Sequence, residues 1–96
     1  MKIIADICII PIGVGVSLSE YIKKAHQVLV DSNLNATLHS YGTGVEGDYD
    51  EVMFAVKKAM ETLHEAGVPR LNVSLKVGSR TDKIQTMQDK IDAVAK

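Results

Sequence analysis

The sequence predicts a single α+β domain in which helices cover one face of an antiparallel sheet, and three observations lead to this class. Two segments, 3–10 and 71–77, alternate in side-chain character with the period of two that is typical of strands. Two longer segments, 18–32 and 49–66, repeat apolar residues every three or four positions, as amphipathic helices do. The 96 residues suffice for one hydrophobic core, so we expect one domain over 1–96.

The first third of the chain predicts a central strand followed by a helix. Residues 3–10 place apolar side chains on both faces of the strand, which favours a position inside the sheet. Ser17 and Glu20 have the S-x-x-E spacing of a capping box, so a helix is expected to open there. Asn33 follows the last apolar residue of this helix and is a candidate left-handed C-cap.

The middle of the chain predicts two short strands and a second helix. We expect strands at 36–41 and 43–46, joined by a tight turn or bulge at Gly42. Asp48 stands three residues before Glu51, which repeats the capping pattern and predicts the start of the helix.

The last third predicts a half-buried strand at 71–77 and a short C-terminal helix. Apolar residues recur at helical spacing in this last segment, at Ile84, Met87, Ile91 and Val94. Since so short a helix has little stability alone, it must pack either on its own domain or on another subunit.

The order strand, helix, strand, strand, helix, strand is that of the ferredoxin-like βαββαβ sandwich with a four-stranded antiparallel sheet, here with an additional C-terminal helix. Two helices then cover one face of the sheet. Alternation gives the opposite face a set of half-apolar, half-polar side chains: Ile4, Asp6, Cys8, Ile10, Asn72, Ser74 and Lys76. Such a face suits a partner subunit together with a ligand.

Composition and motifs argue against several classes of function. Eleven basic and twelve acidic side chains leave no broad cationic surface, so no nucleic-acid partner is expected. Cys8 is the single cysteine and has no CxxC neighbour, which favours a cytoplasmic protein without a metal site. No apolar run is long enough for a membrane span, so no membrane partner is expected. The chain lacks G-x-S-x-G and H-E-x-x-H motifs, so we expect no catalytic residues and no cofactor.

Three stretches of the chain, taken together in their order and spacing, indicate a protein family. They are 10–13 with 19–21, 38–47 with 50–53, and 80–83 with 89–90. Together they resemble the thiamine-binding protein family, small ferredoxin-like domains formerly classed as uncharacterised. The resemblance covers nearly the whole chain, and its most specific part is the Thr43-x-x-Glu46-Gly47 pattern. It implies a cytosolic homo-oligomer, a dimer or tetramer, that binds thiamine or its hydroxymethylpyrimidine portion without known catalysis. Around Gly78 and Arg80 the chain departs from the family's common pattern, in which acidic residues often stand.

Thiamine carries a thiazolium cation and an aminopyrimidine, and a carboxylate can interact favourably with both groups. Glu46 can accept from the amine or offset the cation, or it can instead pair with Lys76 across the sheet. Gly44 and Gly47 flank Glu46 and would let a flat ring approach the backbone. Thr43 can present its hydroxyl to the ligand or only shape the turn.

Four further residues are candidates for the same site. Tyr41 can stack on a pyrimidine or pack at an interface, and His39 can donate to a heterocycle or a phosphate. Asp6 is costly to bury without a partner, which can be Lys76, a hydroxyl or a ligand, and Lys76 has the converse need.

We therefore expect a non-catalytic, homo-oligomeric domain that holds a thiamine-like molecule near Thr43 and Glu46. Two alternatives stay open. One is a structural or regulatory oligomer that binds a protein partner and no thiamine. The other is an enzyme that uses Asp6, His39 or Glu46 as acid and base.

Overall fold

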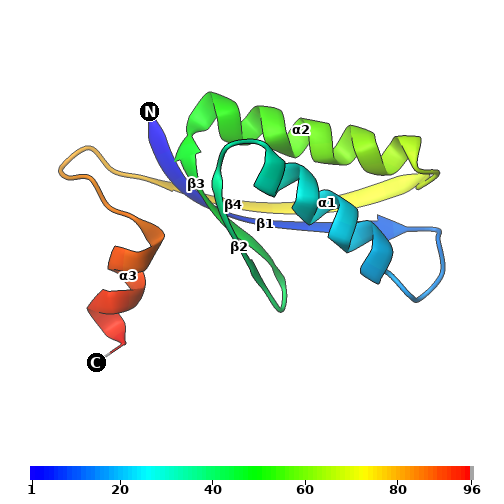
Figure 1. The fold of residues 1–96 in the computed structure, drawn as a ribbon, viewed down its shortest axis with the longest axis horizontal. Coiled ribbons are helices and arrows are strands. Elements are labelled where there is room, and N and C mark those ends of the chain that lie inside the picture. Colours follow the sequence, from blue (N-terminus) through cyan, green and yellow to red (C-terminus); the bar gives the residue numbers. More distant parts are fainter. Residues whose placement is uncertain (96) are drawn as a thin grey trace.

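The computed structural model describes residues 1–95, and within them it confirms the ferredoxin-like α+β fold with an added C-terminal helix (Figure 1). The elements in chain order are β1 (Lys2–Ile12), α1 (Ser19–Asp31), β2 (Asn35–His39), β3 (Gly42–Asp48), α2 (Tyr49–Glu65), β4 (Arg70–Ser79) and α3 (Met87–Val94). The strands form one antiparallel sheet in the order β2-β3-β1-β4, so β1 is internal, as its apolar pattern predicts.

The hydrophobic core lies between one face of the sheet and the two long helices, α1 and α2 (Figure 1). The odd-numbered residues of β1 point into it: Ile3, Ala5, Ile7 and Ile9 are all buried. The helices contribute an apolar stripe of Ala25, Leu29, Val52, Ala55, Val56, Ala59 and Leu63. Full burial of one large aliphatic side chain contributes about 1.5–3 kcal/mol, so this layer supplies most of the folding free energy.

The other side of the sheet, which we call the open face, is not covered by α1 or α2. Antiparallel register places cross-strand neighbours on the same face, so Ile4 of β1 lies between Glu46 of β3 and Gly78 of β4. The side chains of this face come from all four strands: Lys2, Ile4, Asp6, Cys8, Ile10, Asn35, Thr37, His39, Glu46, Asn72, Ser74 and Lys76. This set contains every residue that alternation predicts for the open face.

The first helix begins one residue later than the Ser17 and Glu20 spacing predicts. Its N-cap is Leu18, which makes no side-chain capping bond, and the Leu18 carbonyl accepts from the backbone of Ile22. Ser17 therefore lies one position outside the cap, and the predicted capping box is wrong. The other end agrees with the sequence, because Asn33 adopts the left-handed conformation, with φ of 62°.

The β2–β3 hairpin turns at Ser40 and Tyr41, and strand β2 therefore ends before the predicted 36–41 limit. Gly42 is required after this turn, since a Cβ there would lie 2.6 Å from the backbone oxygen of Ile7. Strand β3 then leads directly into α2. The cap of α2 is Asp48, as predicted, and its side chain accepts from the backbone N–H of Asp50 at 3.1 Å.

Helix α3 begins at Met87 and is opened by a capping box between Thr86 and Asp89. The segment from Ile84 to Thr86 precedes the helix, so its predicted start is three residues early. None of the residues of α3 that the structure describes is buried, and the helix stands away from the sheet (Figure 1). Of its apolar stripe, Met87 is half-buried with its sulfur over Gly44 of the sheet, while Ile84, Ile91 and Val94 stay exposed. Packing of the stripe on its own domain, one of the two expected arrangements, is therefore adopted only at Met87.

Candidate functional site

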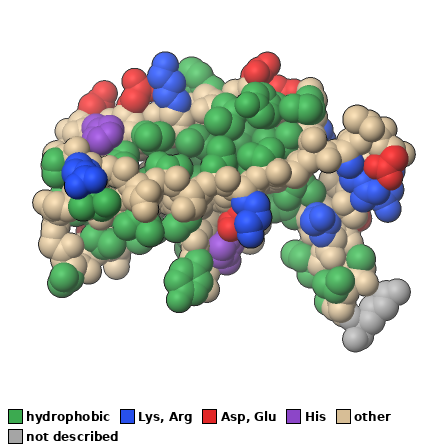
Figure 2. Space-filling model, turned by 180° about the vertical axis from the view of Figure 1, so that it is seen from behind, with side chains coloured by type: hydrophobic (Ala, Val, Ile, Leu, Met, Phe, Trp, Pro, Cys, Tyr) green, Lys and Arg blue, Asp and Glu red, His purple; other side chains and the backbone are tan. Residues whose placement is uncertain are grey.

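The larger cavity of the domain lies on the open face, between the β1–β4 end of the sheet and the chain that follows β4. Its volume is about 1120 Å³, which accommodates a molecule the size of a substituted heterocycle. Its floor includes Ile4, Gly44 and Gly78, and its outer wall is built by residues 80–90. Figure 2 shows the matching hollow between the two parts of the chain that project from the sheet, the β2–β3 hairpin and α3.

One strand neighbour of Ile4 and one of Asp6 place no side chain in the cavity, because a glycine lies there on each of the strands that flank β1. Gly44 is paired with Asp6, and Gly78 is paired with Ile4, so neither neighbour contributes a side chain there. A Cβ at Gly78 would meet no heavy atom nearer than 3.9 Å, which shows the free space above that strand. The outer wall is stiffened by Arg80, which donates to Asp82 at 2.5 and 2.7 Å and to Gln85 at 3.0 Å.

Glu46 joins the sheet to the outer wall. Its Oε2 accepts from the backbone N–H of Met87 at 2.7 Å, and its Oε1 accepts from the side-chain amide of Asn35. Met87 is the first residue of α3, so a carboxylate stands where the helix dipole favours negative charge. Neither of the two roles expected for Glu46 appears, because it does not line the cavity and does not pair with Lys76. It is a positioning residue for α3.

Asp6 and His39 are brought together on the open face. His39 Nε2 lies 2.6 Å from Asp6 Oδ1, and the backbone N–H of Tyr41 donates to His39 Nδ1 at 3.2 Å. Since Nδ1 accepts, the ring proton resides on Nε2 and is donated to Asp6. The half-exposed Asp6 thus has a partner within the protein, which is His39 and not Lys76.

Thr43 lies on the other side of the sheet. It is only 4% exposed, and its hydroxyl is 3.1 Å from Nδ1 of His26 on α1. Thr43 and Glu46 therefore cannot hold one ligand between them, which corrects the expectation from the sequence motif. Thr43 instead borders a second, small cavity of about 110 Å³ beneath the hairpin.

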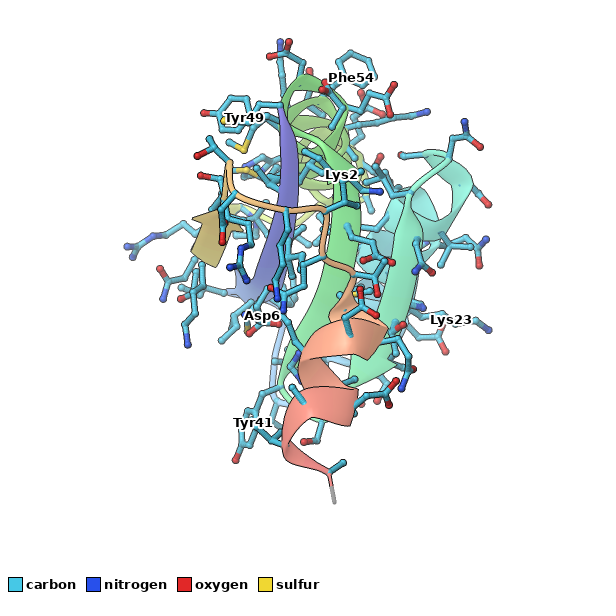
Figure 3. The ribbon with its side chains drawn as sticks, turned by 90° about the vertical axis from the view of Figure 1, so that its left-hand side faces the viewer. Lys2, Asp6, Lys23, Tyr41, Tyr49 and Phe54 are labelled. Atoms are coloured by element: carbon cyan, nitrogen blue, oxygen red, sulfur yellow. The ribbon has the colours of Figure 1, made fainter. Side chains whose placement is uncertain are left out.

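Tyr41 projects from the tip of the hairpin with its side chain 84% exposed (Figure 3). It neither stacks over the large cavity nor packs on its own domain. Of the six candidates, only Asp6 and Lys76 line the large cavity, and His39 adjoins it through Asp6.

Most of the charged residues around this cavity were not predicted from the sequence. Beside Lys76, its lining includes Lys2, Arg80, Lys83 and Lys90. Lys2 has the strand parity of Ile4 and Asp6, so alternation could have placed it on the open face. The two lysines of the outer wall had no such signal, because the path of the chain after β4 is not repetitive.

Two carboxyl groups near the outer wall have perturbed pKa values. The guanidinium of Arg80 lowers the pKa of Asp82 to about 2, chiefly through its hydrogen bonds. The capping bonds from Thr86 lower the pKa of Asp89. Within residues 1–95, no group of three or more His, Cys, Asp or Glu side chains is arranged to hold a metal ion. In the same range, no helix has the length and apolar character needed to cross a membrane.

Fold and cavity together define a ferredoxin-like α+β domain with a large, partly basic cavity on the open face of its sheet. The chain belongs to the thiamine-binding protein family, because the family model described as "Thiamine-binding protein" matches residues 5–95. The UPF0045 protein sll0230 of Synechocystis sp. is 46% identical over 98% of this chain and 78% of its own length. The UPF0045 protein ECM15 of Eremothecium gossypii is 43% identical over 97% of this chain and 90% of its own.

Solved structures agree with the fold. The crystal structure of the hypothetical protein MJ1052 from Methanocaldococcus jannaschii superposes with a TM-score of 0.92 at 39% identity, covering 98% of this chain and 96% of that one. A Thermotoga maritima protein, TM0486, proposed to act in thiamine biosynthesis or salvage, superposes with a TM-score of 0.84. Its identity is 22% over 97% of this chain and 98% of its own, so it supports the architecture alone.

Proposed function

We propose that this protein binds thiamine or its hydroxymethylpyrimidine portion in the large cavity, as a non-catalytic homo-oligomer of the cytoplasm. The observation that carries the proposal is the cavity itself. It has a volume of about 1120 Å³ and an apolar floor, and the carboxylate of Asp6 is part of its lining. The family description supports the ligand class.

The floor and margin of the cavity suit a flat aminopyrimidine. Gly78 leaves room for a ring to lie on the backbone beside Ile4. The second oxygen of Asp6 is not used by His39, so it can accept from an exocyclic amine. In this proposal Asp6 is the carboxylate that accepts from the amine of the ligand, a role that the sequence motif predicted for Glu46.

The absence of catalysis is proposed because the polar groups of Glu46 and His39 are already hydrogen-bonded within the protein. Both oxygens of Glu46 accept hydrogen bonds, and both ring nitrogens of His39 are engaged. Neither residue contacts a serine, threonine or cysteine side chain that it could activate as a nucleophile, among the hydrogen bonds of residues 1–95. These groups hold the site together and are not poised for proton transfer to a substrate.

The homo-oligomer is proposed from apolar surface that one subunit leaves uncovered. Ile84 and Val94 are more than 80% exposed, and Ile91 is more than half exposed. Ile10 on the open face is also exposed. Because a short helix without buried side chains is marginal in water, a second copy that covers this stripe would stabilise it.

Calorimetry with thiamine and with hydroxymethylpyrimidine tests the ligand, and the natural chain is expected to bind one of them with a micromolar constant, about 8 kcal/mol. Gly78→Val fills the floor where a Cβ meets no close neighbour, so it should fold and lose binding at least about tenfold. Ser74→Val, on the same face of β4 but outside the cavity, is the matched control and should bind normally.

Two results would reject parts of the proposal. If neither compound releases or absorbs heat with the natural chain, the ligand class is wrong, and a protein partner recovered in stoichiometric amount would then favour the structural alternative. If light scattering gives the mass of one chain at micromolar concentration, the homo-oligomer is wrong.

A further inference from the structure

We propose that the large cavity selects a phosphorylated ligand, a phosphate monoester of the heterocycle in preference to the free alcohol. This inference rests on the proposed function and adds the chemical form of the ligand. It is carried by lysines from separate elements that line one cavity and make no salt bridge within residues 1–95.

The charge on the lining is strongly one-sided. Five basic side chains line the cavity, against two acidic ones. Both acidic side chains already have partners, because Asp6 accepts from His39 and Asp82 is bound by Arg80. Four lysines remain without a carboxylate within 4.0 Å in the part of the chain that the structure describes, namely Lys2, Lys76, Lys83 and Lys90.

These lysines approach the cavity from both of its sides. Lys2 and Lys76 rise from the open face of β1 and β4, two residues before Ile4 and Gly78 of the floor. Lys83 and Lys90 belong to the outer wall, and Asp89 lies close enough for Lys83 to contribute to lowering its pKa. Figure 3 looks along the sheet from this end and shows Lys2 and Asp6 on β1 behind the outer wall.

The basic lining is a local feature and not a result of composition, since the whole chain has a formal charge of −1. A cleft lined by one sign of charge focuses its field and concentrates ligands of the opposite sign. A phosphate monoester carries about −1.5 to −2 at neutral pH, and its oxygens accept charge-assisted hydrogen bonds from lysine. The thiazolium of unphosphorylated thiamine is a cation, which the same lysines disfavour. The apolar floor is then left for the ring, and the lysines for the phosphate.

The test compares matched ligand pairs by calorimetry on the full chain: hydroxymethylpyrimidine against its monophosphate, thiamine against thiamine monophosphate, and inorganic phosphate alone. We expect each ester to bind at least about tenfold more tightly than its alcohol, a difference of about 1.4 kcal/mol. The affinity of the ester should fall as salt is raised from about 50 to 500 mM, because screening weakens the lysine contacts.

Lys76→Gln keeps the length and polarity of the side chain and removes its charge. It should weaken binding of the ester more than binding of the alcohol, so that the preference for the ester falls about fivefold. Lys23→Gln is the control, since Lys23 is exposed on α1 and lines neither cavity (Figure 3).

The outcomes separate this inference from the function on which it rests. Equal affinity for ester and alcohol in the natural chain, or an equal loss of both in Lys76→Gln, would overturn the phosphate selection and leave heterocycle binding intact. Inorganic phosphate bound as tightly as the ester would also overturn it, because the ring would then contribute nothing. Failure of every heterocycle, phosphorylated or not, would reject the proposed function itself.

Discussion

Replacing Glu46 by glutamine should loosen α3 without unfolding the domain. The carboxylate holds two donors, one of which is the first N–H of α3. A hydrogen bond to a charged group contributes about 1.5–3 kcal/mol and a neutral one about 0.5–1.5 kcal/mol. A negative charge at a helix N-terminus adds about 0.3–1 kcal/mol.

The neutral amide of glutamine therefore costs about 1–2 kcal/mol, mostly at the contact between β3 and α3. Met87 is the one residue of α3 that is half-buried and the rest are exposed, so little else opposes the local opening of this helix. A change of this size raises the open population by a factor of about 5–30.

Hydrogen exchange followed by mass spectrometry measures that population. Peptides covering 86–95 should exchange about tenfold faster in Glu46→Gln, while those of α2 exchange as before. Glu61→Gln is the control, because Glu61 is exposed on α2 and makes none of the side-chain hydrogen bonds found in residues 1–95. Unchanged exchange in 86–95, or an equal acceleration in α2, would refute the assignment of Glu46 as the residue that positions α3.

Two further predictions concern single groups. Thr43→Val removes the hydroxyl that faces His26, so urea denaturation should show a loss of about 1 kcal/mol, while calorimetry should show unchanged binding in the large cavity. The pKa of Asp89 is lowered by its capping bonds with Thr86, so the unfolded chain takes up the proton first and the stability of α3 should fall as the pH drops below about 4. Exchange in 86–95 should therefore show a pH dependence, after correction for intrinsic rates, that Asp89→Asn makes weaker; an unchanged dependence would contradict the linkage.

The fold could be predicted because its signals are local. Alternation in 3–10 and 71–77 identifies strands, and the same alternation separates the core face from the open face. Asn33 and Asp48 were correctly assigned because a helix end depends on a few adjacent residues. The Ser17 prediction failed for the same kind of reason, since a one-residue shift in the cap is enough to remove a capping bond.

The site could be predicted only in part. Asp6 and Lys76 line the cavity because strand parity put both on the open face. Thr43 and Glu46 stand three residues apart in one strand, so alternation itself places them on opposite faces. The prediction that both hold one ligand followed the family motif and not this alternation. The contact of Glu46 with Met87 spans 41 residues and depends on the path of an irregular segment, so no local pattern reports it.

In the function proposed here, stability and recognition lie on different sides of the same sheet. Residues such as Lys76 and Gly78 line the cavity on the open face and are not part of the buried core, so exchanging them leaves the folding of one subunit almost unaffected. In evolution, a lineage of such domains can drift from one small molecule to another by accepting changes on that side alone. Descendants with diverged specificities would then keep nearly superimposable backbones.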